Sequence, residues 1–85
     1  MGEITLRETA IGVYESADRN VVVEVHGEFV DLFTKGGSHT LHVNVWKSRF
    51  PSKSSFYTGK VWNEAGQAFS VQLEVMKTAA VLSWK

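Results

Sequence analysis

Apolar and polar residues alternate at every second position along much of this 85-residue chain. The alternation is strict near the C-terminus, where Phe69, Val71, Leu73 and Val75 alternate with Ser70, Gln72 and Glu74. Successive side chains of a strand point to opposite faces, so this pattern indicates strands with one buried face. Short turn clusters separate the alternating segments, as in hairpin-connected strands. The sequence predicts an all-β fold, either a small antiparallel barrel or a two-layer sandwich, with about six strands.

Residues 63–80 leave one alternative open, because they contain many helix-forming residues. Phe69, Leu73 and Met76 have roughly helical spacing. A C-terminal helix in this segment would make the fold α+β. The strict alternation over residues 69–75 favours a strand.

Length and composition predict one domain over residues 1–85. Apolar residues make up 44% of the chain and charged residues 21%, which is typical of globular proteins. A domain this small buries a modest part of its surface, so self-association is one way to stabilise it. The chain has no cysteine, which excludes disulfides, thiolate zinc sites and cysteine nucleophiles. It also has no apolar signal core or membrane-spanning run, so we expect a cytoplasmic protein.

Three glycine-containing segments predict turns. The inward parity of the apolar residues changes around Gly27, which predicts a bulge or sharp bend there. Gly36 and Gly37 are typical of a two-residue hairpin turn, with Lys35 opposite Ser38. Residues 64–66 end in glycine and predict a three-residue hairpin loop with Gly66 in the left-handed conformation.

These two hairpin registers place aromatic rings on both faces of the strands. In the first hairpin, Phe29 and Phe33 lie opposite the face of the apolar pairs. In the second, Tyr57 points into the core, whereas Phe56 and Trp62 point outward. A sheet with rings on its outer face needs a partner, a ligand or a second layer to cover them.

Charges are distributed unevenly along the chain, although nine acids and nine bases give it no net charge. Residues 1–32 contain seven acids and two bases, a net charge of −5, whereas residues 33–62 contain five bases and no acid, a net charge of +5. Pairing between neighbouring strands would neutralise these segments. The alternative is a functional dipole. The absence of net charge argues against a general polyanion binder.

The sequence contains no motif that frames a catalytic site. Ser38, His39 and His42 follow Asp31 in the first hairpin, but no nucleophile elbow or oxyanion loop accompanies them. No phosphate-binding loop or dinucleotide fingerprint occurs either. We therefore expect no enzymatic activity, no catalytic residues and no cofactor.

His26 has a carboxylate two positions away on each side, Glu24 and Glu28, on the same strand face. These groups could reach one metal ion, but their spacing matches no known metal motif. A solvated polar face accounts for them, so we expect no metal.

A basic segment interleaved with aromatic residues and free of acids is the candidate binding site. Its candidate binding residues are Trp46, Lys47, Arg49, Phe50, Phe56, Lys60 and Trp62. Trp, Phe and Arg are common anchors of protein interfaces. The same residue types stack on the bases of single-stranded nucleic acid and neutralise its phosphates. A third interpretation makes some of these rings core, with the register shifted by one residue.

The sequence therefore predicts a non-enzymatic interaction module. We expect it to self-associate as a homo-oligomer, or to bind a protein partner, through an outward aromatic face. The alternative is a small barrel that binds single-stranded DNA or RNA through segment 46–62. Neither interpretation involves a membrane.

Overall fold

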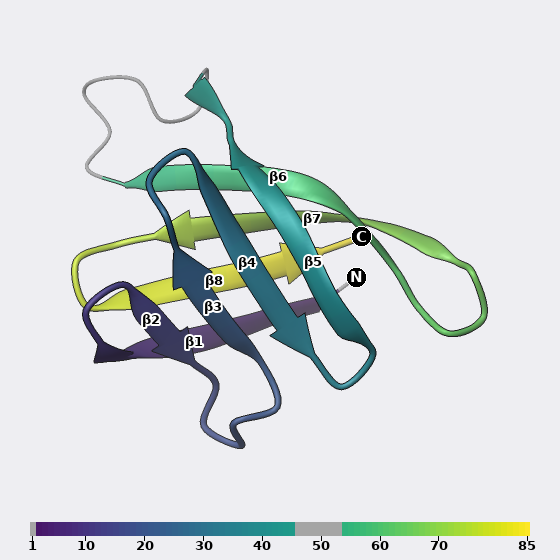
Figure 1. Ribbon diagram of the computed structural model, residues 1–85, viewed down its shortest axis with the longest axis horizontal. Helices are drawn as coiled ribbons and strands as arrows, with labels where there is room; N and C mark the ends of the chain where they lie inside the picture. The colour runs from purple at the N-terminus through teal and green to yellow at the C-terminus, as the bar shows by residue number, and fades with distance from the viewer. Residues whose placement is uncertain (1, 46–53) are drawn as a thin grey trace.

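The computed structural model describes residues 2–45 and 54–85, and these residues form eight antiparallel strands (Figure 1). The strands are β1 (Gly2–Ala10), β2 (Val13–Glu15), β3 (Val22–Val25), β4 (Phe29–Thr34), β5 (Gly37–Val43), β6 (Ser55–Trp62), β7 (Ala68–Val75) and β8 (Ala79–Trp84). Each strand pairs with the next, and β8 pairs with β1, which closes an up-and-down barrel. The predicted all-β antiparallel barrel is confirmed. The alternative of a C-terminal helix is wrong, because residues 68–75 form a strand paired on both sides. The described residues contain no helix that could cross a membrane.

The strand count is eight instead of about six because two segments each contain a chain reversal that divides them into two strands. Residues 2–15 form two strands joined at Ile11 and Gly12, where Gly12 has a φ of 74° and Ala10 pairs with Val13. Residues 22–34 also form two strands, β3 and β4. Both extra turns contain a glycine at positive φ, a conformation that other residues rarely adopt.

Gly27 lies in a hairpin turn, so the predicted bulge or bend within one strand is wrong. Gly27 has a φ of 86°, and the backbone N–H of His26 donates a hydrogen bond to the oxygen of Phe29 at 2.9 Å. Across this turn Val23 pairs with Leu32. Residues paired across a two-residue loop have opposite parity, one odd and one even. The inward residues therefore do change from odd to even positions near Gly27, but they do so because the chain reverses direction there.

The hairpin between β4 and β5 is shifted by two residues from the predicted register. Thr34 pairs with Gly37, so the turn residues are Lys35 and Gly36. The Thr34 hydroxyl accepts a hydrogen bond from the Gly36 N–H at 3.2 Å and donates one to the Gly37 oxygen at 3.4 Å. These local bonds hold a turn that places only Gly37 at positive φ, 130°. A shift of two residues leaves every side chain on its predicted face.

The hairpin between β6 and β7 has the predicted register. Val61 pairs with Phe69, and Gly66 adopts a φ of 81° at the end of the three-residue loop. Asn63 donates its backbone N–H to the oxygen of Gln67 at 3.0 Å, and its side-chain oxygen accepts the Gln67 N–H at 3.0 Å. Local turn chemistry alone sets this register, so the sequence could reveal it.

The inward side chains of all eight strands form one core. Its buried apolar members are Leu6, Tyr14, Val23, Val30, Leu32, Leu41, Tyr57, Val71, Leu73, Ala80 and Leu82. They occupy alternate positions of their strands, as a closed barrel requires.

Two tyrosines close one end of the barrel. The Tyr57 hydroxyl donates a hydrogen bond to the Gly27 oxygen at 2.7 Å, and the Tyr14 hydroxyl donates one to the Met76 oxygen at 3.3 Å. Burial raises the pKa of both phenols above the ordinary value of 10.0. We call this the closed end. The opposite end, which holds the β4–β5 and β6–β7 hairpins, is the open end (Figure 1).

Candidate functional site

The predicted binding residues divide between described and undescribed parts of the chain. Trp46, Lys47, Arg49 and Phe50 lie outside the described residues. The others, Phe56, Lys60 and Trp62, lie at alternate positions of β6 and point away from the core.

The three described members differ in exposure. Phe56 is half-buried and Lys60 is exposed. Trp62 retains 54% of its surface exposed. The interpretation that places these rings in the core therefore does not hold for Trp62. Tyr57 is buried in the core, as the predicted register of this hairpin indicated.

Two further rings lie on the outer face of β4. Phe29 is 39% exposed and Phe33 is 37% exposed. The His26 ring stacks on Phe29 with the centroids 5.0 Å apart and an interplanar angle of 28°. Phe33 lies between Val22 of β3 and Ser38 of β5 in the two ladders. Val22 is half-buried and Ser38 is short, so Phe33 has no large neighbour across the ladder toward β5.

His26 does meet two carboxylates, but one of them is not the predicted one. Its Nε2 lies 3.1 Å from the Asp31 Oδ2 and 3.7 Å from the Glu24 Oε1. Glu28 lies in the hairpin turn, whereas Asp31 pairs directly with Glu24 across β3 and β4. Ligand atoms of the three residues lie within 4.8 Å of one another. Polar contacts of the imidazole with the two carboxylates account for this partly exposed cluster, and we assign it no metal.

The polar residues of the first hairpin are not assembled as a triad. Ser38 and His42 point outward from β5, whereas His39 lies on the inward side with Leu41. Asp31, the expected acid, contacts His26 instead. The side chains of a nucleophile, a base and an acid are therefore not brought together here.

Among the described residues, the ladder between β5 and β6 has the fewest pairs. His42 pairs with Thr58 and Val43 with Tyr57, and the Asn44 N–H donates to the Phe56 oxygen at 2.7 Å. No pair of this ladder is found closer to the open end among the described residues. By contrast, β6 pairs with β7 along its whole length. We call the unpaired stretch, between residues 38–40 of β5 and 60–62 of β6, the seam.

The backbone groups that face the seam follow from the hydrogen-bond pattern of the neighbouring ladders. The Val43 N–H donates to the Glu28 oxygen, so odd-numbered residues of β5 bond toward β4. The backbone groups of Ser38 and Thr40 therefore face the seam. The same alternation in the β6–β7 hairpin turns the backbone groups of Lys60 and Trp62 toward the seam from the other side.

Gly59 marks the point where β5 and β6 separate. A Cβ atom at Gly59 would lie 2.7 Å from the Leu41 Cδ2 and 3.3 Å from the Thr40 oxygen. Glycine therefore allows β5 to pass close to β6 while the Leu41 side chain fills the core beside it. Beyond this crossing the two hairpins run apart, and their tips are well separated in Figure 1.

An apolar cavity of about 230 Å³ lies at the open end. It is lined by Ile4, Val21, Leu32, Thr34, Val61, Phe69, Val71, Leu82 and Trp84. Thr34 is the polar side chain among these residues. The lining comes from β1, β4, β6, β7 and β8, together with Val21 just before β3, and no β5 residue belongs to it. The inward position of Gly59 was the sequence signal that could have indicated an incompletely filled barrel.

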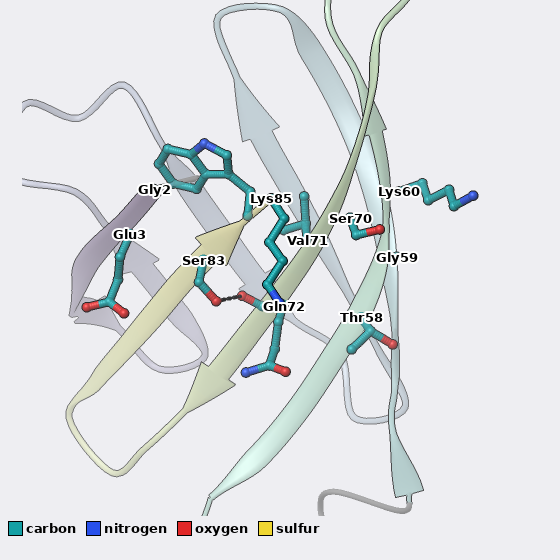
Figure 2. Close-up of a pocket in the computed structure, with 11 residues that line it drawn as sticks. Gly2, Glu3, Thr58, Gly59, Lys60, Ser70, Val71, Gln72, Ser83 and Lys85 are labelled. Carbon is teal, nitrogen blue, oxygen red and sulfur yellow. Dashed lines mark hydrogen bonds between the residues drawn. The ribbon is translucent and has the colours of Figure 1, made fainter.

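A larger groove of about 930 Å³ follows the outer face of β6, β7 and β8 (Figure 2). Short polar side chains line it, among them Thr58, Ser70 and Ser83. In Figure 2 the Lys85 side chain runs along this face, whereas Lys60 points away from it. The Ser83 hydroxyl donates a long hydrogen bond of 3.5 Å to the Gln72 oxygen. The groove is larger than the open-end cavity and its lining is more polar.

Comparison with known proteins finds no matching family model, no matching curated protein and no matching solved structure. The function must therefore be inferred from the geometry of the barrel itself.

Proposed function

We propose that this protein is a non-enzymatic interaction module that binds a protein partner or a second copy of itself. Its contact surface is the outer face of β4, β5 and β6, with Phe29, Phe33, Phe56 and Trp62 as the aromatic anchors. We call these four residues the aromatic face. The observation that carries the proposal is the 54% exposure of Trp62, together with the exposure of Phe29 and Phe33.

The arrangement of these rings suits a single partner. β4 and β6 flank β5, and neighbouring strands lie about 4.8 Å apart, so the two sets of rings are about 10 Å or more apart. A standard protein interface of about 800 Å² per partner covers that distance. Between the rings, β5 presents the short side chains of Ser38 and Thr40, which leave a shallow strip for a protruding partner residue.

Burial of the exposed rings supplies the binding free energy. Trp is the residue type most enriched among interface hot spots, and removal of such an anchor typically costs 2 kcal/mol or more of binding. A second copy of the chain would bring matching rings to the same contact in a two-fold dimer. We therefore keep self-association and binding of a different protein as two forms of the same proposal, set in the cytoplasm.

Single-stranded nucleic acid is the second candidate. Lys60 and Trp62 lie two residues apart on the outward side of β6, which places a positive charge beside an exposed ring. A base could stack on Trp62 while Lys60 contacts its phosphate. The undescribed Trp46, Lys47, Arg49 and Phe50 belong to the same predicted set. The absence of net charge on the chain favours the protein partner.

Sedimentation velocity of the wild type and of a Phe33→Ser/Trp62→Ser variant tests the self-association form. We expect the wild type to form a dimer or larger species at micromolar concentrations and the variant to be a folded monomer. Lys35→Ser, an exposed change at the hairpin tip, is the matched control and should leave the wild-type distribution unchanged. A monomeric wild type at 100 μM would reject self-association, and tryptophan quenching by an oligothymidylate at low salt would favour the second candidate.

A further inference from the structure

The open-end cavity carries an inference that goes beyond the proposed function. We propose that it binds a small, uncharged, apolar ring molecule about the size of two fused rings. The cavity is formed by inward side chains, and none of the four residues of the aromatic face lines it. The inference is therefore independent of the aromatic face.

The lining of the cavity consists of a buried floor and a half-buried mouth. Leu32, Val71 and Leu82 form the floor, and they are 1%, 6% and 5% exposed. The other six lining residues are half-buried, and they are Ile4, Val21, Thr34, Val61, Phe69 and Trp84. Because the side chains of the mouth are partly exposed, a ligand can reach the cavity from solvent.

Nothing in the lining requires a charged or strongly polar ligand. It contains no charged side chain, and His39, on the inward side of β5, is not part of it. The Thr34 hydroxyl already donates a hydrogen bond to the Gly37 oxygen and accepts one from the Gly36 N–H. The indole N–H of Trp84, at the half-buried mouth, is the other polar side-chain group of the lining.

Hydrogen bonding within the barrel is also complete without a ligand. Among the described residues, no buried side-chain nitrogen or oxygen atom lacks a hydrogen-bond partner. A charged ligand would therefore lose its contacts with water in the cavity and gain few in return, which is costly. An apolar ligand has no such contacts to lose, and apolar cavities bind small apolar molecules for this reason.

Size and depth favour a compact ring over a long chain. An apolar cavity of about 150 Å³ binds benzene, and 230 Å³ is about half as large again, which corresponds to two fused rings such as indene. Leu6 and Leu73, inward residues of β1 and β7 further from the open end, are completely buried, so the packed core ends the cavity. A long acyl chain would have to extend into solvent. Phe69 and Trp84 provide aromatic surface against which a ring can pack.

Methyl NMR of the wild-type protein, titrated with indene, tests the proposal. We expect the methyl signals of Val71 and Leu82 to shift in a saturable manner, because the bound ring changes their magnetic shielding. The methyl signals of Val25 and Val75, at the closed end, should not shift. Benzimidazole has nearly the shape of indene but two polar nitrogen atoms, and decanoate has a long chain and a charge. Each should bind at least tenfold more weakly than indene.

The variant Val61→Phe fills the cavity from the β6 side and should bind indene at least tenfold more weakly than the wild type. Val81→Phe is the matched control. Val81 is also half-buried, but it lies between the buried Ala80 and Leu82 of β8 and therefore points outward. This control should bind indene within twofold of the wild type. If the methyl spectrum shows that Val61→Phe does not fold, Val21→Phe fills the cavity from another wall.

The proposal would be overturned by any of four results. They are no saturable shift up to the solubility limit of indene, equal shifts at the closed end, equal binding by the filled variant and the wild type, and binding of benzimidazole or decanoate as tight as that of indene. Tight binding of decanoate would assign the cavity to an acyl chain instead. The proposed function fails by a different result, namely sedimentation that does not change in Phe33→Ser/Trp62→Ser. That variant should bind indene within twofold of the wild type, so the two proposals are tested separately.

Discussion

The two ends of the barrel contain similar strands but differ in how their backbone and core are completed. At the closed end, Tyr14 and Tyr57 reach across to turn carbonyls, and β5 and β6 are paired. At the open end, the β5–β6 ladder stops and the inward side chains surround a cavity. The difference shows that the two ends of one barrel can differ in how completely their ladders and their core are closed.

Residues of β1 offer a direct comparison of the two ends. Leu6 is completely buried, whereas its isomer Ile4, two positions closer to the open end, lines the cavity. We expect Leu6→Ala to lower the free energy of unfolding by about 2–5 kcal/mol, because it leaves a hole in a packed core. Ile4→Ala should cost less, because Ile4 is only partly buried and already borders a cavity. Urea unfolding followed by tryptophan fluorescence measures both, and equal losses would contradict the distinction between the ends.

The crossing at Gly59 is the boundary between the two halves. In Gly59→Ala the added methyl group would press against Leu41, and overpacking of this kind costs about 1–3 kcal/mol. The change should also move β5 away from β6 and extend the seam. Hydrogen exchange should then quicken at the amides of His42 and Thr58, which pair in the β5–β6 ladder.

The double variant Leu41→Ala/Gly59→Ala tests whether the cost of Gly59→Ala comes from the contact with the Leu41 side chain. Leu41→Ala removes the contacted side chain, so Gly59→Ala should cost less in that background than in the wild type. An equal cost in both backgrounds would indicate that the Thr40 backbone, which also lies close to Gly59, is the obstacle.

The sequence predicted the elements whose structure depends on local chemistry. The β6–β7 register follows from Asn63 and Gly66, and the outward positions of Lys60 and Trp62 follow from that register. The β4–β5 register was wrong by two residues, because Thr34 bonds to the turn and moves it. A parity change at Gly27 is compatible with either a bulge or a two-residue hairpin, so the strand count could not be predicted.

The cavity and the seam could not be predicted for a different reason. Ile4, Val21 and Phe69 come from distant segments and meet only when β8 pairs with β1. The end of the β5–β6 ladder depends on how two hairpins with fixed internal registers approach each other around Gly59. Such tertiary geometry leaves no periodic signal in the sequence.

Tyr57 provides a test of how the closed end is held. Tyr57→Phe removes a hydrogen bond of 2.7 Å to the Gly27 oxygen and should cost about 1 kcal/mol. Tyr14→Phe should cost less, because its bond to Met76 is longer, 3.3 Å. A cost for Tyr57→Phe within experimental error would mean that packing alone closes this end.

Both tyrosines also predict the alkaline behaviour of the barrel. Their pKa is raised by burial, so the unfolded chain loses these protons at a lower pH than the folded barrel. The stabilisation is complete below pH 10 and is lost as the pH rises through the raised pKa. Urea midpoints measured between pH 8 and pH 11 should fall, and the fall should be smaller in Tyr57→Phe.

The smallest expected effect is at the loop of residues 16–21, beside the open end. The Ser16 hydroxyl donates a hydrogen bond to the Asp18 Oδ1 at 2.6 Å, and the Asn20 backbone N–H donates one to the same oxygen at 3.0 Å. These bonds lower the pKa of Asp18 below its ordinary value of 3.8, and the bond from Ser16 has the largest effect. The charged carboxylate therefore stabilises the fold above pH 3.8, and this contribution is lost as the pH falls through the lowered pKa. Asp18→Asn should lower the urea midpoint slightly at pH 6, and the difference should shrink as the pH falls below 3.8. A difference that stays constant as the pH falls would show that the loop depends on the shape of the side chain instead of its charge.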